Sequence, residues 1–342
     1  MNNPAENANG AKVLVVDDMQ INLELTSFML SPYGVQVDMR ESGIEAVEAV
    51  KTSRYDLIFM DHMMPEMDGI EAVKLIRESG GHNSHVPIIA LSGAYDLEEK
   101  FLQNGFNGFL PKPIDPDTLD AVVVKWIPKE KLSSSAESAV SADSKEHINI
   151  DGIDTALGLS RMAGSIENYL RTLTIFYKDG TRKIDEIGQC LKTDNLHLYT
   201  IHVHALKGAA ANIGAMDLSG AAKALEEAGN KKDRAFIDAH TPRLLTDLEV
   251  QLKGIDEFLA MERERWNQSG GTDSEALKAA LNSLISAIDE FCPAAINTAA
   301  KELRPYEHAS EIGDKIESIL QNVLIGEYDE VLVLIDSIGS FL

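Results

Sequence analysis

The feature that most constrains the fold is a regular alternation of short apolar runs and amphipathic segments over residues 11–129. Strand-like apolar runs occupy Lys12–Val16, Val35–Met39, Asp56–Met60, Pro87–Leu91 and Gly108–Leu110. Helix-like segments follow them at Gln20–Leu30, Ile44–Thr52, Ile70–Ser79, Leu97–Asn104 and Asp117–Trp126. Five such β-α units predict a parallel sheet that is covered by helices on both faces.

Polar residues fall where these strands end. Asp17 and Asp18 follow the first strand, Asp61 the third, Ser92 the fourth and Lys112 the fifth. In open parallel sheets the reactive groups collect at the carboxyl ends of the strands. Three carboxylates at one edge repel each other unless a cation lies among them. We expect this cation to be Mg²⁺, a hard ion that binds oxygen ligands.

Phosphoryl transfer to a carboxylate gives each of these groups a role. Asp61 is the expected nucleophile, while the cation and Lys112 neutralise phosphoryl oxygens and the Ser92 hydroxyl donates a hydrogen bond. A metal hydrolase built on the same acids would turn over external phosphate esters repeatedly. We do not favour it, because Lys112 and Ser92 match a self-phosphorylating aspartate better.

The segments VVDD, MDHMMPEMDG, ALSG and PKP together resemble the motifs of response-regulator receiver domains, which have a flavodoxin-like order of five strands. The metal ligands that this resemblance implies are Asp17, Asp18, Asp61 and the backbone carbonyl of Met63. It also implies that Ser92 and Phe109 act as switch residues and that Pro113 follows Lys112 through a cis peptide bond. Because Phe109 lacks a hydroxyl group, any switch would operate through packing.

A second, helical region follows a tether. Residues 130–149 include LSSSAESAVSADSKE, which has no apolar periodicity and is typical of a flexible linker. Over residues 150–266, amphipathic segments predict an up-and-down helical bundle, with breaks at Asp179-Gly180, Thr193-Asp194, Gly214 and Gly229-Asn230. The expected helices are Ser165–Tyr177, Thr181–Leu191, Asn195–Ile213, Met216–Ala228 and Arg234–Met261.

His204 stands out in this region. On a helical wheel it lies opposite a broad, mostly apolar side made of Leu198, Ile201, Ala205, Ala209, Asn212 and Ile213. We therefore expect His204 to face water. Its neighbours on the exposed strip would be Lys207 and three residues that leave a surface for a docking partner, Thr200, Gly208 and Ala211.

His204, Lys207, Gly208 and the closing Gly214-Ala215 resemble the signature of histidine-containing phosphotransfer (HPt) domains. The resemblance implies that His204 carries the phosphoryl group. A neutral imidazole is a competent nucleophile near pH 7, and Lys207, one turn on, can offset the added charge. We expect Gly208 to remove bulk where an attacking carboxylate must approach closely.

Two nearby histidines fit other roles. His202 points toward the apolar side of the helix and is expected to be a core or boundary residue. His197 shares the exposed strip but lacks a following Lys and Gly, so we expect it to be solvated. A metal site among these histidines is not expected, because their positions on the helix diverge.

Residues 273–342 are the least informative part of the chain. Amphipathic segments at Ser274–Phe291, Ala294–Leu303, Ser310–Leu324 and Tyr328–Phe341 predict a further small helical domain. His308 lacks the downstream Lys and Gly and is not expected to accept a phosphoryl group. This domain could serve in docking or self-association, but a purely structural packing role is the simpler interpretation.

Composition limits partners and compartment. A formal net charge of -24 argues against nucleic-acid binding, since such a chain repels phosphate backbones. No apolar run approaches a membrane span and the N-terminus is polar, so we expect a cytoplasmic protein without membrane contact. Cys190 and Cys292 have no metal-like spacing and are expected to be reduced.

These expectations combine into a multistep phosphorelay. The receiver would accept a phosphoryl group on Asp61, and His204 would exchange it with a receiver aspartate in the same chain or in another protein. No nucleotide-binding motif is present, so a sensor histidine kinase would be the phosphoryl source and a downstream response regulator receiver the destination. The order of the two domains resembles the C-terminal part of hybrid sensor histidine kinases, without their ATP-binding kinase domain, and whether the chain is itself an enzyme stays open. The alternative is a phosphorylation-controlled docking scaffold in which His204 is not used.

Overall fold

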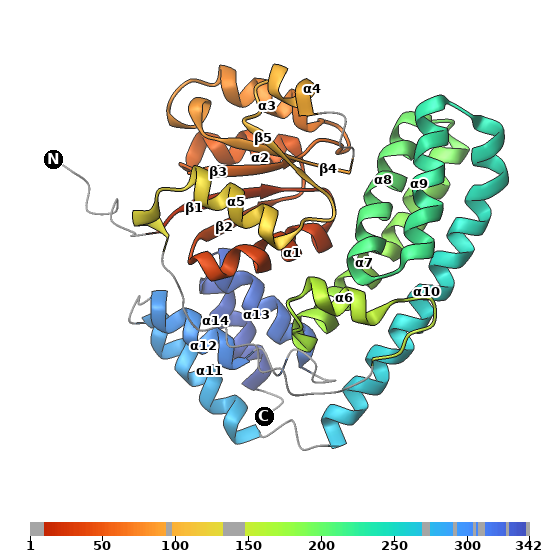
Figure 1. Ribbon diagram of the computed structural model, residues 1–342. Helices are drawn as coiled ribbons and strands as arrows, with labels where there is room; N and C mark the ends of the chain where they lie inside the picture. Colours follow the sequence, from red (N-terminus) through yellow and green to blue (C-terminus); the bar gives the residue numbers. More distant parts are fainter. Residues whose placement is uncertain are drawn as a thin grey trace. The chain divides into compact units, whose positions relative to one another are not determined.

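The computed structural model describes residues 10–93, 98–132, 148–268, 274–289, 293–303, 306, 312–325 and 328–339. The chain divides into two compact units, Met1–Asp256 and Glu257–Leu342. The first unit contains the α/β domain and the helix that bears His204 (Figure 1).

A five-stranded parallel sheet forms the centre of the α/β domain, in the order β2-β1-β3-β4-β5. Its strands are β1 (Lys12–Val16), β2 (Gln36–Arg40), β3 (Leu57–Asp61), β4 (Ile88–Ser92) and β5 (Gly108–Pro111). Strands β3 and β4 are buried along their whole length, as expected of central strands that are apolar on both faces. The flavodoxin-like sheet predicted from the sequence is confirmed.

Helices cover both faces of this sheet (Figure 1). Side chains of α1 and α5 pack with Val13 and Val15 of β1 on one face, and side chains of α2, α3 and α4 pack with Leu14 and Val16 on the other. These side chains alternate along β1 because successive residues of a strand point to opposite faces. The helices are α1 (Gln20–Leu30), α2 (Gly43–Thr52), α3 (Gly69–Glu78), α4 (Glu98–Gln103) and α5 (Pro116–Trp126).

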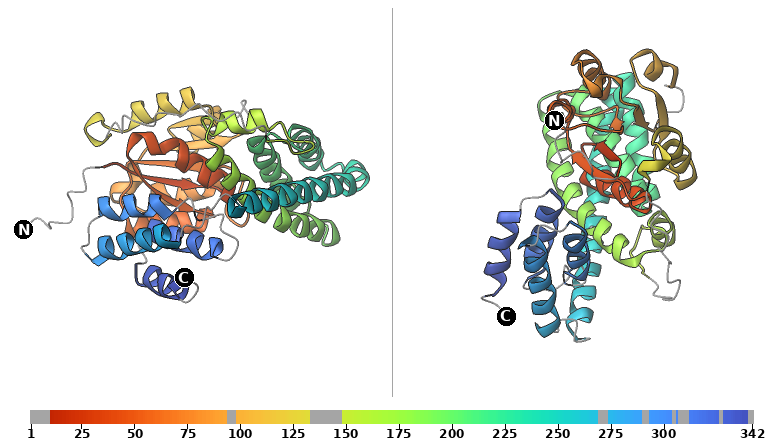
Figure 2. Two further views of the ribbon diagram at one scale, coloured as in Figure 1. Left: turned by 90° about the horizontal axis from the view of Figure 1, so that it is seen from below. Right: turned by 90° about the vertical axis from the view of Figure 1, so that its left-hand side faces the viewer.

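The second part of the first unit is helical. Its long helices run alongside one another in the two views of Figure 2. They are α7 (Ile166–Lys192), α8 (Leu196–Ile213), α9 (Met216–Lys231) and α10 (Arg234–Gln268), preceded by the short α6 (Thr155–Arg161). The last residues of α10, 257–268, belong to the second unit. The predicted breaks at Thr193-Asp194 and Gly214 are confirmed, and Asp194 and Gly214 both have positive φ, at 55° and 89°.

Two predicted breaks are wrong. Helix α7 continues through Asp179-Gly180, where a Cβ on Gly180 would lie 2.8 Å from Leu252 Cδ2. Helix α9 continues through Gly229 and ends at Lys231, and a Cβ on Gly229 would lie 2.2 Å from Thr200 Oγ1. Both glycines therefore allow close packing between helices and do not form turns.

The second unit, Glu257–Leu342, is helical in its described residues. It contains α11 (Ser274–Asp289), α12 (Pro293–Leu303), α13 (Gly313–Ile325) and α14 (Tyr328–Gly339), whose apolar side chains share one buried cluster. This agrees with the amphipathic pattern of the sequence. His308, Cys292 and most of the predicted tether, residues 133–147, lie outside the described residues. Among the helices that are described, none is both long and apolar enough to cross a bilayer.

Candidate functional site

Three carboxylates converge at the carboxyl ends of neighbouring strands. Asp17 and Asp18 follow β1, Asp61 ends β3, and each offers an oxygen that lies within 4.8 Å of the oxygens offered by the other two. In the sheet, β2 lies on one side of β1 and β3 lies on the other. The acids therefore lie at the point where the strand order reverses. Their predicted convergence is confirmed by this geometry.

Lys112, after β5, neutralises two of these acids. Its Nζ lies 2.5 Å from Asp17 Oδ2 and 2.8 Å from Asp61 Oδ2, and the Lys112-Pro113 peptide bond is cis, as the receiver resemblance implied. Burial raises the pKa of Asp17. Burial also acts to raise the pKa of Asp61, but the charge of Lys112 and the nearby His62 ring, whose Nδ1 lies 3.6 Å from Asp61 Oδ1, outweigh it and leave that pKa below its ordinary value. Asp61 is therefore ionised at neutral pH.

The acidic cluster fits a hard divalent cation. Asp18 Oδ1 is buried and has no hydrogen-bond partner, so one carboxylate oxygen is available as a ligand beside the oxygens of Asp17 and Asp61. An all-oxygen donor set of this kind suits Mg²⁺. Met63, the remaining predicted ligand, lies two residues after Asp61, and its backbone N–H is 3.5 Å from Asp61 Oδ1.

The two predicted switch residues lie at neighbouring strands. Ser92 is fully buried and ends β4, the strand that pairs with β3. Phe109 of β5 stacks on Phe101 with ring centroids 6.1 Å apart, and Phe101 contacts His62 edge-on at 5.4 Å. A row of rings thus runs from Phe109 to the residue that follows Asp61. Their role as a switch stays a prediction.

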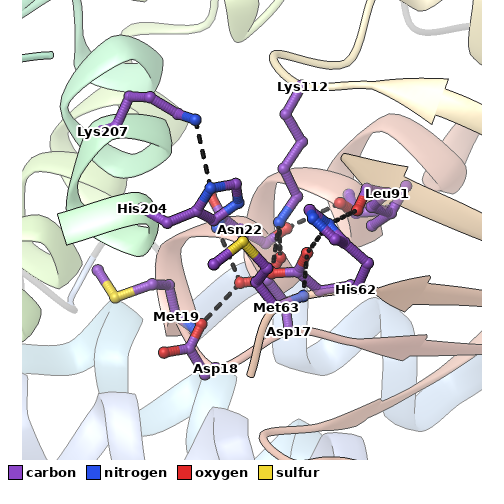
Figure 3. Close-up of polar contacts among 12 residues, drawn as sticks. Asp17, Asp18, Met19, Asn22, His62, Met63, Leu91, Lys112, His204 and Lys207 are labelled. Carbon is purple, nitrogen blue, oxygen red and sulfur yellow. Dashed lines mark hydrogen bonds and ion pairs between the residues drawn. The ribbon is translucent and has the colours of Figure 1, made fainter. Parts of the chain in front are cut away.

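The expected exposure of His204 is wrong. Only 3% of the residue is accessible, because the side of α8 that was expected to face water packs against the α/β domain. The ring of His204 lies edge-on to the ring of His62, with centroids 5.3 Å apart. Figure 3 shows His204 extending from α8 toward His62, Lys112 and Asp17. The histidine is buried between two domains and is not enclosed within its own bundle.

The distance between His204 and Asp61 is short enough for group transfer. A ring nitrogen of His204, one of His62 and a carboxylate oxygen of Asp61 all lie within 4.8 Å of one another. A phosphorus atom bonded to Asp61 and about 3–3.5 Å from an attacking nitrogen places the two reacting atoms roughly 5 Å apart. The carboxylate and the imidazole are therefore close enough for a phosphoryl group to pass from one to the other.

Glu226 of α9, which sequence reasoning missed, orients His204. Its Oε1 lies 2.6 Å from His204 Nδ1, and its Oε2 lies 2.6 Å from Lys207 Nζ. Burial acts to raise the pKa of Glu226, but the hydrogen bond to His204 and the charge of Lys207 lower it to about 2. An ionised carboxylate only accepts hydrogen bonds, so Nδ1 carries the proton and Nε2 keeps its lone pair.

Lys207 lies beside the histidine as predicted, with Nζ 3.3 Å from His204 Nδ1. Burial, together with the charge of Lys207, lowers the pKa of His204, which is therefore neutral near pH 7. A neutral imidazole with an available Nε2 is a nucleophile. The environment of His204 thus supplies the protonation state that accepting a phosphoryl group requires.

The predicted docking strip is partly wrong. Thr200 is buried against Gly229 of α9, so it belongs to the bundle and not to a free surface. Ala211 is also buried, at 7% exposure. Gly208 faces a small cavity that it shares with Asn22, Lys112 and other residues, and a Cβ on Gly208 would have no atom within 4 Å.

The close approach that we assigned to Gly208 belongs to Gly93 instead. A Cβ on Gly93, which follows β4 in the ALSG motif, would lie 3.0 Å from Lys207 Nζ and 3.9 Å from His204 Cε1. The small residue that admits the histidine is therefore contributed by the α/β domain. The helical wheel could not show this, because it describes a helix without its partners.

His202 is buried, as predicted, but in a polar environment. Its Nδ1 lies 3.1 Å from Lys183 Nζ and 3.2 Å from a Glu186 oxygen, and burial together with Lys183 lowers its pKa to about 4. His197 is exposed, as expected of a solvated residue. Lys183, which the sequence did not single out, is paired with Asp18 across the domain contact at 3.2 Å.

Helix α1 of the α/β domain makes further polar contacts with α7 and α8. Asn212 Nδ2 donates to Asn22 Oδ1 at 2.8 Å, and Arg171 pairs with Glu24 at 3.2 Å. The backbone N–H of Ile21 donates to an Asp179 carboxylate oxygen at 3.3 Å. Asn212 was expected on the bundle-facing side of α8, and its contact with α1 corrects that assignment.

An acidic, lysine-neutralised strand-end site apposed to a buried histidine defines a domain pair suited to exchanging a phosphoryl group. Comparison with known families agrees: the response regulator receiver domain family matches residues 13–124, and the Hpt domain family matches residues 171–258. The chain therefore contains a receiver domain followed by an Hpt domain.

Its relatives include hybrid sensor kinases. Sensor protein GacS of Pseudomonas syringae pv. syringae is 30% identical over 250 residues, which is 72% of this chain and 27% of GacS. Signal transduction histidine-protein kinase BarA of Escherichia coli K12 is 31% identical over 51% of this chain and 19% of BarA. The chain thus spans about a quarter or less of these relatives. With its two domains, it is placed among two-component phosphorelay signalling proteins.

Solved structures match the receiver part. The receiver domain of sensor histidine kinase PA1611 from Pseudomonas aeruginosa PAO1, which was crystallised with a magnesium ion in its active-site cleft, is 34% identical. The match covers 34% of this chain and 97% of that chain, with a TM-score of 0.32.

Proposed function

We propose that this chain relays a phosphoryl group between Asp61 and His204 within one molecule, and between these residues and other two-component proteins. The observation that carries the proposal is the placement of the Asp61 carboxylate and a His204 ring nitrogen within 4.8 Å of each other, in a buried contact between the receiver and Hpt domains. Burial excludes water, which would otherwise hydrolyse the acyl phosphate.

The transfer step is a direct displacement at phosphorus. The lone pair on His204 Nε2 attacks the phosphorus of phospho-Asp61, and a P–N bond forms as the P–O bond breaks. Asp61 leaves as a carboxylate, which its lowered pKa favours. The reverse step uses the Asp61 carboxylate as nucleophile and returns the electron pair to Nε2. Both phosphorylated species are reactive, so the exchange can run in either direction.

Charged groups around the two atoms stabilise the migrating group. Lys112 already lies 2.8 Å from an Asp61 oxygen and is placed to pair with a phosphoryl oxygen, and we assign the Ser92 hydroxyl to a second oxygen. Asp17, Asp18 and Asp61, with the Met63 carbonyl, would hold Mg²⁺, whose charge would offset that of the phosphoryl group.

On the Hpt side, Glu226 and Lys207 prepare the histidine. Glu226 fixes the proton on Nδ1, and Lys207 offsets negative charge near the ring. In the wider pathway, a sensor histidine kinase would supply the phosphoryl group and a downstream response regulator would receive it. The cytoplasm is the compartment that we propose for this exchange.

Labelled phosphosites test the relay. The wild-type chain, Asp61→Asn and His204→Gln are each incubated with a radiolabelled acyl phosphate that charges Asp61 directly. Phosphohistidine is stable to base and labile to acid, whereas an acyl phosphate is labile to base. We expect both species in the wild type, only the base-labile one in His204→Gln, and neither in Asp61→Asn. Base-labile label alone in the wild type would favour the docking scaffold.

A further inference from the structure

Lys183 of α7 is an unusual residue in the Hpt domain because its side chain is almost completely buried. Only 2% of it is accessible, although a lysine is normally exposed at its charged end. Its Nζ lies 2.9 Å from a Glu186 oxygen and 3.1 Å from His202 Nδ1, so part of its environment comes from its own domain.

The third partner of Lys183 belongs to the receiver. Asp18 Oδ2 lies 3.2 Å from Lys183 Nζ, and the pair is buried, with 6% of the Asp18 side chain accessible. Asp18 is also one of the three acids of the proposed cation site. The Hpt domain therefore places a positive charge on a metal-binding carboxylate of the receiver.

The other oxygen of Asp18 is available for a metal. Asp18 Oδ1 is buried without a hydrogen-bond partner, while Lys112 neutralises Asp17 and Asp61. One carboxylate of the acidic cluster thus has an ammonium beside one oxygen and a second oxygen without a hydrogen-bond partner. Two cations that share one carboxylate repel each other, and at such distances the repulsion is large in a buried site.

We propose that Lys183 and a divalent cation compete for the negative charge of Asp18, so that docking of the Hpt domain and metal binding weaken each other. This inference rests on the magnesium site of the proposed function. The coupling is reciprocal: if docking lowers the affinity of the receiver for the metal, the metal lowers the stability of the docked arrangement by the same factor.

Such coupling would give the relay a way to release its histidine. His204 is 3% exposed while the domains are docked, so it must leave the receiver of its own chain before a second receiver can reach it. Metal loading of the receiver would shift the population toward the undocked arrangement. Lys183 would then set how long His204 stays with Asp61.

Metal affinity gives the first test. Mg²⁺ binding to the full chain is measured by calorimetry for the wild type, for Lys183→Gln and for a control, Lys192→Gln, which changes an exposed lysine at the end of the same helix. We expect Lys183→Gln to bind Mg²⁺ about tenfold more tightly, on the scale of one removed nearby charge, and Lys192→Gln to match the wild type.

The second test needs no substitution. The Ile21 amide lies in the first turn of helix α1, where it has no partner within the helix, and its hydrogen bond to Asp179 exists only while the domains are docked. We expect saturating Mg²⁺ to speed hydrogen exchange at Ile21 in the wild type. An unchanged affinity in Lys183→Gln, or an unchanged or slower Ile21 exchange with Mg²⁺ bound, overturns the inference and leaves the relay intact. Absence of Mg²⁺ binding in every variant overturns the metal site itself.

Discussion

A ring nitrogen of His204 and a carboxylate oxygen of Asp61 lie within 4.8 Å of each other, although the two residues belong to different domains. The contact is buried, with 1% of Asp61 and 3% of His204 accessible. This placement supports the proposal that the receiver of this chain exchanges a phosphoryl group with the Hpt domain that follows it.

Glu226 provides a test of how the histidine is activated. We expect Glu226→Ala to slow phosphoryl transfer to His204 by at least about tenfold, because Nδ1 loses the acceptor that fixes its proton. Nitrogen NMR of the ring should show a mixture of the two neutral tautomers in this variant and one tautomer in the wild type. Glu227→Ala, which changes an exposed neighbour, is the control. Equal transfer rates in all three proteins would show that Glu226 is not a positioning residue.

Gly93 and Gly208 should respond in opposite ways to added side chains. Gly208→Ala should leave transfer unchanged and stabilise α8 by about 0.5–1 kcal/mol, because its Cβ would meet no atom and alanine favours helix. Gly93→Val should slow transfer, because its side chain would meet Lys207 and approach His204. Transfer rates and thermal unfolding of both variants check this. Slow phosphoryl transfer in Gly208→Ala together with normal transfer in Gly93→Val would contradict the observed approach of Gly93 to Lys207.

The strand-end site was predictable and the histidine environment was not, for one physical reason. Asp17 and Asp61 follow strands of a parallel sheet, whose topology brings their carboxyl ends together whatever the surroundings. The exposure of His204 depends on what packs against α8, which a helical wheel does not contain. Glu226 and Lys183 lie on other helices and follow no local motif, so only the three-dimensional packing identifies them. Gly180 and Gly229 were assigned to turns because glycine is favoured both in turns and where two helices pack closely together. The sequence alone does not separate these two cases.

Acid should destabilise the chain through His202. Its pKa is about 4 in the folded chain because of burial and the charge of Lys183, compared with about 6.5 when unfolded. At pH values between these two pKa values, the unfolded chain binds more protons than the folded chain. The free energy of unfolding therefore falls by on the order of 3 kcal/mol as the pH drops from about 6.5 to about 4. Above pH 6.5 this contribution does not vary.

The variant His202→Asn isolates this effect, because asparagine can still accept a hydrogen bond from Lys183 but does not titrate. Denaturant unfolding of this variant at several pH values should show a smaller loss below pH 6.5 than the wild type. His197→Asn, at an exposed position, should retain the full loss. A proton NMR titration midpoint near 6.5 for His202 in the folded chain would rule out the assigned environment.

A charge reversal tests whether the docked arrangement is used in transfer. Arg171 and Glu24 form an ion pair between the two domains at 3.2 Å and are both mostly buried. We expect Glu24→Lys to slow Asp61-to-His204 transfer about three- to tenfold through repulsion with Arg171, and the added Arg171→Glu to restore it. Glu48→Lys, at an exposed site on α2, is the control. Failure of the double variant to recover would mean that this contact does not guide docking.

The most direct measurement is the concentration dependence of transfer in a single protein. Asp61 is charged with label, and the rate at which base-stable label appears on His204 is followed over a hundredfold dilution. Transfer within one molecule predicts a first-order rate that dilution does not change, and a much slower rate when His204→Gln molecules must pass label to Asp61→Asn molecules. A rate that falls in proportion to concentration, or a mixture as fast as the wild type at low concentration, would contradict the account.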